Sequence, residues 1–152
     1  MSAKQELRDR LLTVIEPLRL ETRASRTTIR LDLPEIDVHV NLPAAESRQS
    51  GVKSLEQEGS LNQRAAATVV WLEKERRILV QEDFETGRTA PPKELIEIYG
   101  TLAQMLGPLV QDGKLIGWIS VHSNVAPRPW ASNDISALQQ ALDAVQVILR
   151  DI

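Results

Sequence analysis

The stretch MLGPLVQDGKLIGWISVH, residues 105–122, is the most informative part of this sequence. It consists of two apolar runs, 105–111 and 114–122, which are separated by the pair Asp112-Gly113. Asp-Gly between two such runs favours a two-residue turn, because both positions tolerate the positive φ angles that this turn requires. The stretch therefore predicts a β-hairpin with two long antiparallel strands.

Helical and extended patterns alternate on the N-terminal side of this hairpin. Apolar residues at helical spacing predict an amphipathic helix over 7–21, in which Pro17 is expected to kink or end the helix. Period-two alternation predicts a half-buried strand over 25–32, and a second short strand is expected over 36–42. Residues 43–59 are rich in Ser, Gln, Glu and Gly, which indicates a long connecting loop.

The rest of the chain continues in the same mixed manner. We expect, in order, a helix over 61–76, a strand over 78–84, a turn over 85–92, a short helix over 93–99 and a final amphipathic helix over 132–149. Ser60 and Gln63 have the spacing of a capping box for the first of these helices, and Ser132 or Asn133 is expected to cap the last. This order favours an α+β fold with a central antiparallel sheet of about five or six strands, and not a doubly wound parallel sheet.

Composition limits the function further. The 152 residues fit one domain, over 1–152, and contain no cysteine, which excludes disulfides, zinc-thiolate and iron-sulfur sites and thiol catalysis. The formal net charge of -3 argues against nucleic acid as a partner. No apolar run approaches the roughly 18 residues that cross a bilayer, and the N-terminus is polar, so we expect a cytoplasmic protein that does not bind membranes.

The hairpin and its flanks resemble the GAF domain, a sensor module that recurs in phosphodiesterases, phytochromes, histidine kinases and activators of bacterial transcription. The matching segments are Leu106-Gly-Pro-Leu-Val110, Asp112-Gly113, Leu115-Ile-Gly-Trp-Ile-Ser-Val-His-Ser123, Arg128-Pro-Trp130, Asp134-Ile135 with Leu138, and Ala24 to Leu31. The resemblance covers nearly the whole chain. It implies that the N-terminal, second and C-terminal helices lie on one face of the sheet, with a small-molecule pocket under loops and a short helix on the other.

Known activities of that family can be tested on the residues. Free methionine-R-sulfoxide reduction by these domains uses cysteines, and so does covalent bilin attachment, so the resemblance implies neither activity here, although His122 loosely matches a histidine of the bilin-binding members. Cyclic-nucleotide-binding members carry an Asn-Lys pair with Phe and Asp-Glu. The nearest segment here, 81–85, lacks that pair upstream, which weakens this prediction.

Five residues form the candidate ligand-binding set, and each has an alternative role. Strand alternation places Ile116, Trp118, Ser120 and His122 on one face of the last hairpin strand, and Leu115, Gly117, Ile119 and Val121 on the other. Trp118, Ser120 and His122 would then line a pocket, or Trp118 would fill the core while His122 binds a loop backbone. Arg30 would clamp a carboxylate or form an exposed salt bridge. Tyr99 would contact the ligand as a lid or anchor its helix.

The terminal helices carry more apolar surface than one sheet face needs, which favours a homodimer over a monomer. The predicted dimer interface consists of Leu7, Leu11, Leu18, Leu138, Leu142, Val145 and Leu149. We predict no catalytic residue, cofactor or metal site, since His39 and His122 have no partners at metal-ligand spacing.

The sequence thus predicts a stand-alone GAF-type sensor or accessory protein that binds a small aromatic or carboxylate-bearing molecule and signals through a separate partner protein. The alternative is a ligand-free dimerisation and interaction module with a filled pocket. A third hypothesis is an enzyme that uses His122 as an acid or base. The state of the cavity beneath Tyr99, bordered by Trp118 and His122, separates these hypotheses.

Overall fold

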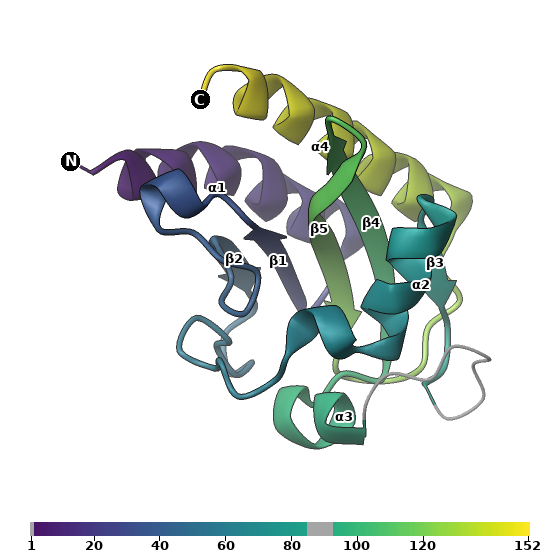
Figure 1. Cartoon of the computed structure of the whole chain (residues 1–152). Coiled ribbons are helices and arrows are strands. Elements are labelled where there is room, and N and C mark those ends of the chain that lie inside the picture. The colour runs from purple at the N-terminus through teal and green to yellow at the C-terminus, as the bar shows by residue number, and fades with distance from the viewer. Residues whose placement is uncertain (1, 85–92) are drawn as a thin grey trace.

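A computed structural model describes residues 2–84 and 93–152 of the chain (Figure 1). In chain order, its elements are α1 (Ala3–Thr22), β1 (Arg26–Leu31), the 3-10 helix η1 (Pro34–Ile36), β2 (Ala45–Arg48), the 3-10 helix η2 (Gln63–Ala65), α2 (Ala67–Glu75), β3 (Leu79–Gln81), α3 (Lys93–Tyr99), β4 (Ala103–Gln111), β5 (Lys114–Ser123) and α4 (Ser132–Arg150). The predicted turn over 85–92 lies outside the described residues.

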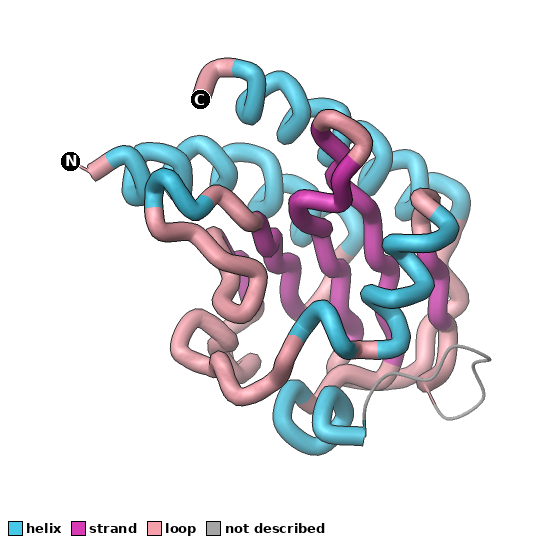
Figure 2. The backbone as a smooth tube through the Cα atoms, viewed as in Figure 1, coloured by secondary structure: helices cyan, strands magenta, loops and turns pink. Residues whose placement is uncertain are grey.

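The strands form a single antiparallel sheet of five strands in the order β2-β1-β5-β4-β3 (Figure 2). The predicted hairpin is confirmed as β4 and β5, with Asp112 and Gly113 at φ angles of 52° and 77° in its turn. The α+β class is therefore confirmed. The first strand of the sequence lies beside the last, and this pairing sets Arg26 opposite His122 and Arg30 opposite Trp118.

Helices cover both faces of the sheet (Figure 1). Helices α1 and α4 pack on one face, around Met105 and Ile119, whereas Val69 and Leu72 of α2 pack on the other with Trp118. The expectation that the second helix shares the face of the terminal helices was therefore wrong. Both faces of β4 and β5 are apolar, so each face needs a helical cover.

A β-bulge in β5 interrupts the alternation that the sequence analysis assumed. Leu109 pairs with Gly117, but the next residue, Val110, pairs with Leu115, so Ile116 is the extra residue. As a result, Leu115 packs in the cluster of Trp118 and Ile116 packs against the cluster of α1 and α4. The predicted faces of Leu115 and Ile116 were therefore exchanged.

The segment between β1 and β2 also differs from the prediction. Residues 36–42 form no regular strand: Asp37, with a φ of 59°, is the C-cap of η1, and a single bridge joins Leu33 to Val38. The second strand instead occupies Ala45–Arg48, inside the segment predicted to be a loop. A proline at the start of η1 favours a tight turn here, because its fixed φ suits the first helical position.

Helix α1 runs through Pro17 to Thr22, so the end predicted near residue 21 is confirmed and an end at Pro17 is not. The starts of two other helices were predicted wrongly. Helix α2 has Ala66 as its N-cap, since the Ser60 hydroxyl bonds to Glu58 instead. Helix α4 starts after Ala131, whose N–H donates to the carboxylate of Asp134.

The apolar stripes of α1 and α4 are used within the chain. Each side chain assigned to the dimer interface is at most 4% exposed in the single chain, namely Leu7, Leu11, Leu18, Leu138, Leu142, Val145 and Leu149. These residues belong to the core between the two helices and the sheet, so that assignment is corrected, whereas the homodimer itself stays a prediction. Within the described residues, no helix combines the length and apolarity that crossing a bilayer requires.

Candidate functional site

A small cavity lies between the sheet and the layer of η2, α2 and the end of α3. All five predicted ligand-binding residues line it: Arg30, Tyr99, Trp118, Ser120 and His122. Its other lining residues are Thr28, Gln63, Thr68, Val69, Gln104 and Leu106. Its volume is about 20 Å³, which is room for about one water molecule.

Arg30 is a buried cation in this cavity. Its side chain is only 2% exposed, and it donates from Nη1 to the Val40 carbonyl at 2.9 Å and from Nη2 to the Tyr99 hydroxyl at 3.3 Å. Burial lowers the pKa of its guanidinium, and the nearby Tyr99 opposes this shift. None of the ion pairs among residues 2–84 and 93–152 includes Arg30. The exposed salt bridge was therefore wrong, because β1 is an inner strand that is buried on both faces.

Tyr99 anchors the end of its helix, one of the two roles predicted for it, whereas contact with a ligand stays a prediction. Its hydroxyl accepts a hydrogen bond from Gln63 Nε2 at 2.8 Å as well as the bond from Arg30. Its backbone carbonyl accepts from Asn124 Nδ2 at 3.1 Å, which holds the end of α3 to the loop after β5. Gln63 was not predicted as a site residue, because its contact with Tyr99 depends on a long-range approach of η2 to α3.

A second buried arginine, Arg26, links the cavity to the edge of the sheet. It is fully buried, and its Nη1 lies 2.9 Å from His122 Nδ1, while its Nε lies 3.9 Å from Glu46 Oε2. It also donates to the carbonyls of Lys53 and Tyr99. Burial lowers the pKa of Arg26 to about 10, and the charge of Glu46 opposes this shift. Arg26 and Glu46 were missed by the sequence analysis, although polar residues alternate along β1.

His122 is held in its neutral form. Burial lowers its pKa well below the usual 6.5, and the positive charges of Arg26 and Arg30 lower it further. Because Arg26 has only N–H groups to offer, His122 Nδ1 is the acceptor in their contact. The lone pair of His122 Nδ1 is therefore already used in the hydrogen bond from Arg26.

Acid is expected to destabilise the protein through His122. The unfolded chain takes up the proton near pH 6.5, before the folded chain does, so this contribution to stability is complete above that pH and is lost as the pH falls below it. In the variant His122→Gln, whose amide oxygen can still accept from Arg26, the loss of unfolding free energy between about pH 7 and pH 5 should be smaller. Urea unfolding at the two pH values measures this. His39→Gln, which removes the exposed histidine, is the control, and an unchanged slope in His122→Gln would contradict the assignment.

One polar atom in the cavity lacks a partner. The hydroxyl oxygen of Thr28 is buried without a hydrogen bond, on a side chain that is 1% exposed. Among the described residues, no group of three acidic, histidine or cysteine side chains is placed to hold a metal ion. The cavity thus offers a hydrogen-bond donor and a buried cation, Arg30, which has no ion-pair partner within 4 Å among the described residues, although the charge of Glu46 acts on it from further away.

The sequence model of the GAF domain family matches residues 6–149. The chain belongs to the GAF domain family. This result confirms the resemblance drawn from the hairpin and its flanks. No curated protein sequence matches this GAF domain.

Solved structures share the fold of this GAF domain at low sequence identity. GAF3 of Slr1393 from Synechocystis, in its photoproduct state, is 19% identical with a TM-score of 0.72, and 95% of each chain is covered. The blue-light-absorbing form of the PixJ GAF domain from Thermosynechococcus elongatus is 18% identical with a TM-score of 0.73, covering 97% of this chain and 89% of the other. The chromophore-binding domain of the bacteriophytochrome RpBphP3 from R. palustris is 17% identical with a TM-score of 0.71, covering 96% and 58%.

Proposed function

We propose that this GAF domain is a sensor that binds a small anionic molecule in its central cavity and signals through a separate partner protein. The observation that carries the proposal is the buried guanidinium of Arg30, which meets only a carbonyl and a phenol. A buried charge is costly unless it is paired, so a counter-charge from a ligand would relieve this cost. A carboxylate or another oxyanion suits the planar fork of an arginine.

The cavity provides a second contact for such an anion. The hydroxyl of Thr28 is buried without a partner and lines the same cavity as Arg30, so it is a free donor for an anionic oxygen. In the structure, the Tyr99 hydroxyl accepts a hydrogen bond from Arg30 Nη2 at the long distance of 3.3 Å. A ligand oxygen would replace this neutral acceptor with a charged one, and charge-assisted hydrogen bonds are the stronger kind.

Ligand entry requires a change of shape. The cavity of about 20 Å³ is far below the roughly 300 Å³ of a typical ligand site, so Tyr99 and Gln63 must move away from the sheet. This movement would displace the end of α3 and η2, which carry these two side chains. A partner that distinguishes the two arrangements would read the presence of the ligand, since a ligand shifts an equilibrium by its differential affinity for two states. The blue-light-absorbing and chromophore-binding domains among the solved structures with this fold support a role in binding a small molecule.

The test is ligand binding by the variant Arg30→Met. A panel of small carboxylates and phosphate esters is screened by thermal shift, and each hit is titrated by calorimetry. We expect Arg30→Met to weaken binding by about 10- to 100-fold, the effect of losing a hydrogen bond to a charged group. The control is Arg10→Met, because Arg10 is an exposed arginine that pairs with Asp151, and neither residue lines the cavity. Equal binding by wild type and Arg30→Met would refute the proposed site.

Thr28→Val gives a second test with two opposite effects. Valine has the shape of threonine without the unpartnered hydroxyl, so the free protein should gain about 1 kcal/mol of unfolding free energy. Affinity for the anion should fall in the same variant, because the free donor is lost. Urea unfolding and calorimetry measure the two effects. A gain in stability with unchanged affinity would show that Thr28 does not contact the ligand.

The alternative function is a ligand-free interaction module, and the small volume of the cavity favours it. In that case Trp118, Tyr99 and Gln63 fill the pocket permanently, and the protein acts only through its surface. No compound in the panel would then stabilise the protein, and the domain would still bind its partner.

A further inference from the structure

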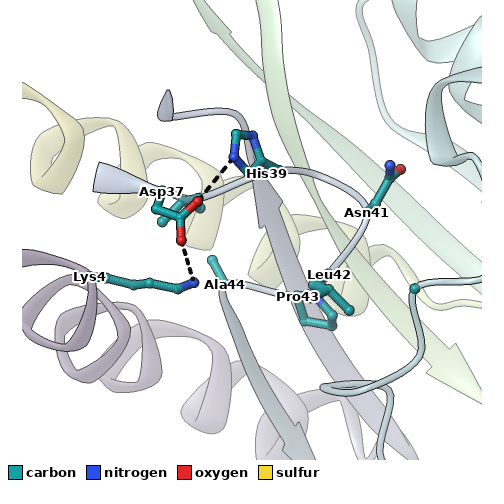
Figure 3. A pocket seen from close by; sticks show the side chains of 9 residues that line it. Lys4, Asp37, His39, Asn41, Leu42, Pro43 and Ala44 are labelled. Atoms are coloured by element: carbon teal, nitrogen blue, oxygen red, sulfur yellow. Dashed lines mark ion pairs between the residues drawn. The ribbon is translucent and has the colours of Figure 1, made fainter. Parts of the chain in front are cut away.

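A second pocket lies on the other side of the segment that follows η1. Its volume is about 420 Å³, within the usual range for small-molecule sites, and it is thus much larger than the central cavity. Its walls come from the start of α1, the connection to β2 and the loop after β2 (Figure 3). The lining residues are Lys4, Asp37, Val38, His39, Asn41, Leu42, Pro43, Ala44 and Gly59. We call it the peripheral pocket.

One wall of the peripheral pocket carries charges of both signs. Figure 3 shows Lys4 and His39 on opposite sides of the Asp37 carboxylate. Lys4 Nζ lies 4.0 Å from Asp37 Oδ2, and His39 Nε2 lies 3.4 Å from Asp37 Oδ1. All three side chains are more than half exposed, so these pairs are weak and a ligand can replace them.

The neighbouring wall is apolar and open. It is formed by Leu42, Pro43 and Ala44, and Leu42 is 43% exposed. Gly59 keeps this wall accessible, because a Cβ at position 59 would lie 3.3 Å from Leu42 Cδ2. The pocket therefore combines an apolar surface with an adjacent cation and anion.

We infer that the peripheral pocket binds a free amino acid with an apolar or aromatic side chain. Lys4 binds the α-carboxylate, Asp37 binds the α-ammonium group, and the side chain lies on Leu42. A simple anion would be repelled by the carboxylate of Asp37, and a simple cation would be repelled by the ammonium group of Lys4. A zwitterion can pair with both side chains. This site is distinct from the central cavity and does not depend on the proposed function.

The two sites share one segment. Val38, His39 and Asn41 line the peripheral pocket, while the carbonyl of Val40, between them, accepts from Arg30 Nη1 at 2.9 Å. The side-chain oxygen of Asn41 also accepts from the backbone N–H of Gln63 at 3.2 Å. A ligand in the peripheral pocket therefore contacts the segment that holds the buried arginine.

Calorimetry of the full chain with three related compounds tests the inference. Phenylalanine carries both charges, 3-phenylpropionate lacks the amine, and 2-phenylethylamine lacks the carboxylate. We expect phenylalanine to bind at least about tenfold more tightly than either analogue, because each analogue leaves one charge of the pocket unmatched. Equally tight binding of one analogue, or no binding of phenylalanine up to about 10 mM, would overturn the inference.

Four variants locate the site. Lys4→Met and Asp37→Asn should each weaken phenylalanine binding by about fivefold or more, and asparagine suits the positive φ of position 37. Gly59→Leu should abolish binding by filling the pocket against Leu42, and its backbone φ permits a side chain. Thr28→Val, which changes the central cavity without removing a hydrogen bond to the segment 37–44, should leave phenylalanine binding unchanged. Undiminished binding by Gly59→Leu, or its loss in Thr28→Val, would assign the ligand elsewhere and refute the peripheral site.

Discussion

Replacing Arg26 with methionine is expected to destabilise the protein by about 3 kcal/mol, because this removes one partner of a buried ion pair. The carboxylate of Glu46 is 1% exposed and would keep the half-exposed Arg48 as an ion-pair partner, with Arg48 Nε 3.6 Å from Glu46 Oε1. It would also keep the hydrogen bonds that the Ser54 hydroxyl and the Leu55 N–H donate to it, each at 2.7 Å. The carbonyls of Lys53 and Tyr99 would also lose a donor, although the Tyr99 carbonyl would keep its bond from Asn124 Nδ2. A buried acceptor that loses its partner adds to the loss of stability.

Urea unfolding, followed by tryptophan fluorescence, measures the effect of Arg26→Met. The matched comparison is Arg26→Met combined with Glu46→Gln, which removes both charges of the pair. The double variant should be less unstable than the sum of the single variants, because residues in one network are not additive. A loss below about 1 kcal/mol in Arg26→Met would show that the pair contributes little to stability.

Such a network explains why the site could be predicted only in part. The five residues of the candidate set were found because strand alternation and the short helix place them by local pattern. Arg26, Glu46 and Gln63 were not found, since their contacts join segments 20 to 96 residues apart, such as Arg26 with His122. Local spacing carries no information about these approaches.

The burial of Arg30 is a second feature that local sequence spacing could not predict. Alternation correctly predicted a strand over this residue, yet whether its polar face is exposed depends on what covers it. The cover comes from Val40 and Tyr99, which lie 10 and 69 positions away in the chain. A strand was predicted over 36–42, but this segment is irregular in the structure, and the backbone carbonyl of Val40 accepts a hydrogen bond from Arg30.

The terminal helices illustrate a further ambiguity. Their apolar stripes were predicted correctly, but a stripe indicates only that it is buried and not what buries it. In the structure, α1 and α4 bury their stripes against each other and against the sheet. A homodimer would therefore have to use a surface other than these seven side chains.

The bulge beside Gly117 leads to the second large effect: Gly117→Ala is expected to destabilise the protein by about 3 kcal/mol or more. A Cβ on Gly117 would lie 2.0 Å from the backbone oxygen of Arg30 and 2.8 Å from Leu31 Cδ2. The backbone of β1 cannot move away alone, because the N–H of Asp32, two residues after Arg30, donates to the Ile116 carbonyl at 2.7 Å. The substitution must therefore separate β1 from β5, the two strands that carry both buried arginines and His122.

The same substitution at Gly107 is the control, because it also crowds a buried strand glycine. There a Cβ would lie 2.7 Å from Leu142 Cδ1, the end of a flexible side chain on α4. A rotation of Leu142 relieves this contact, so Gly107→Ala should destabilise by only about 1 kcal/mol. Urea unfolding of both variants tests the difference, and equal losses would contradict it. If Gly117→Ala separates β1 from β5, it should also weaken anion binding at Arg30, whereas Gly107→Ala, which faces α4, should leave that binding intact.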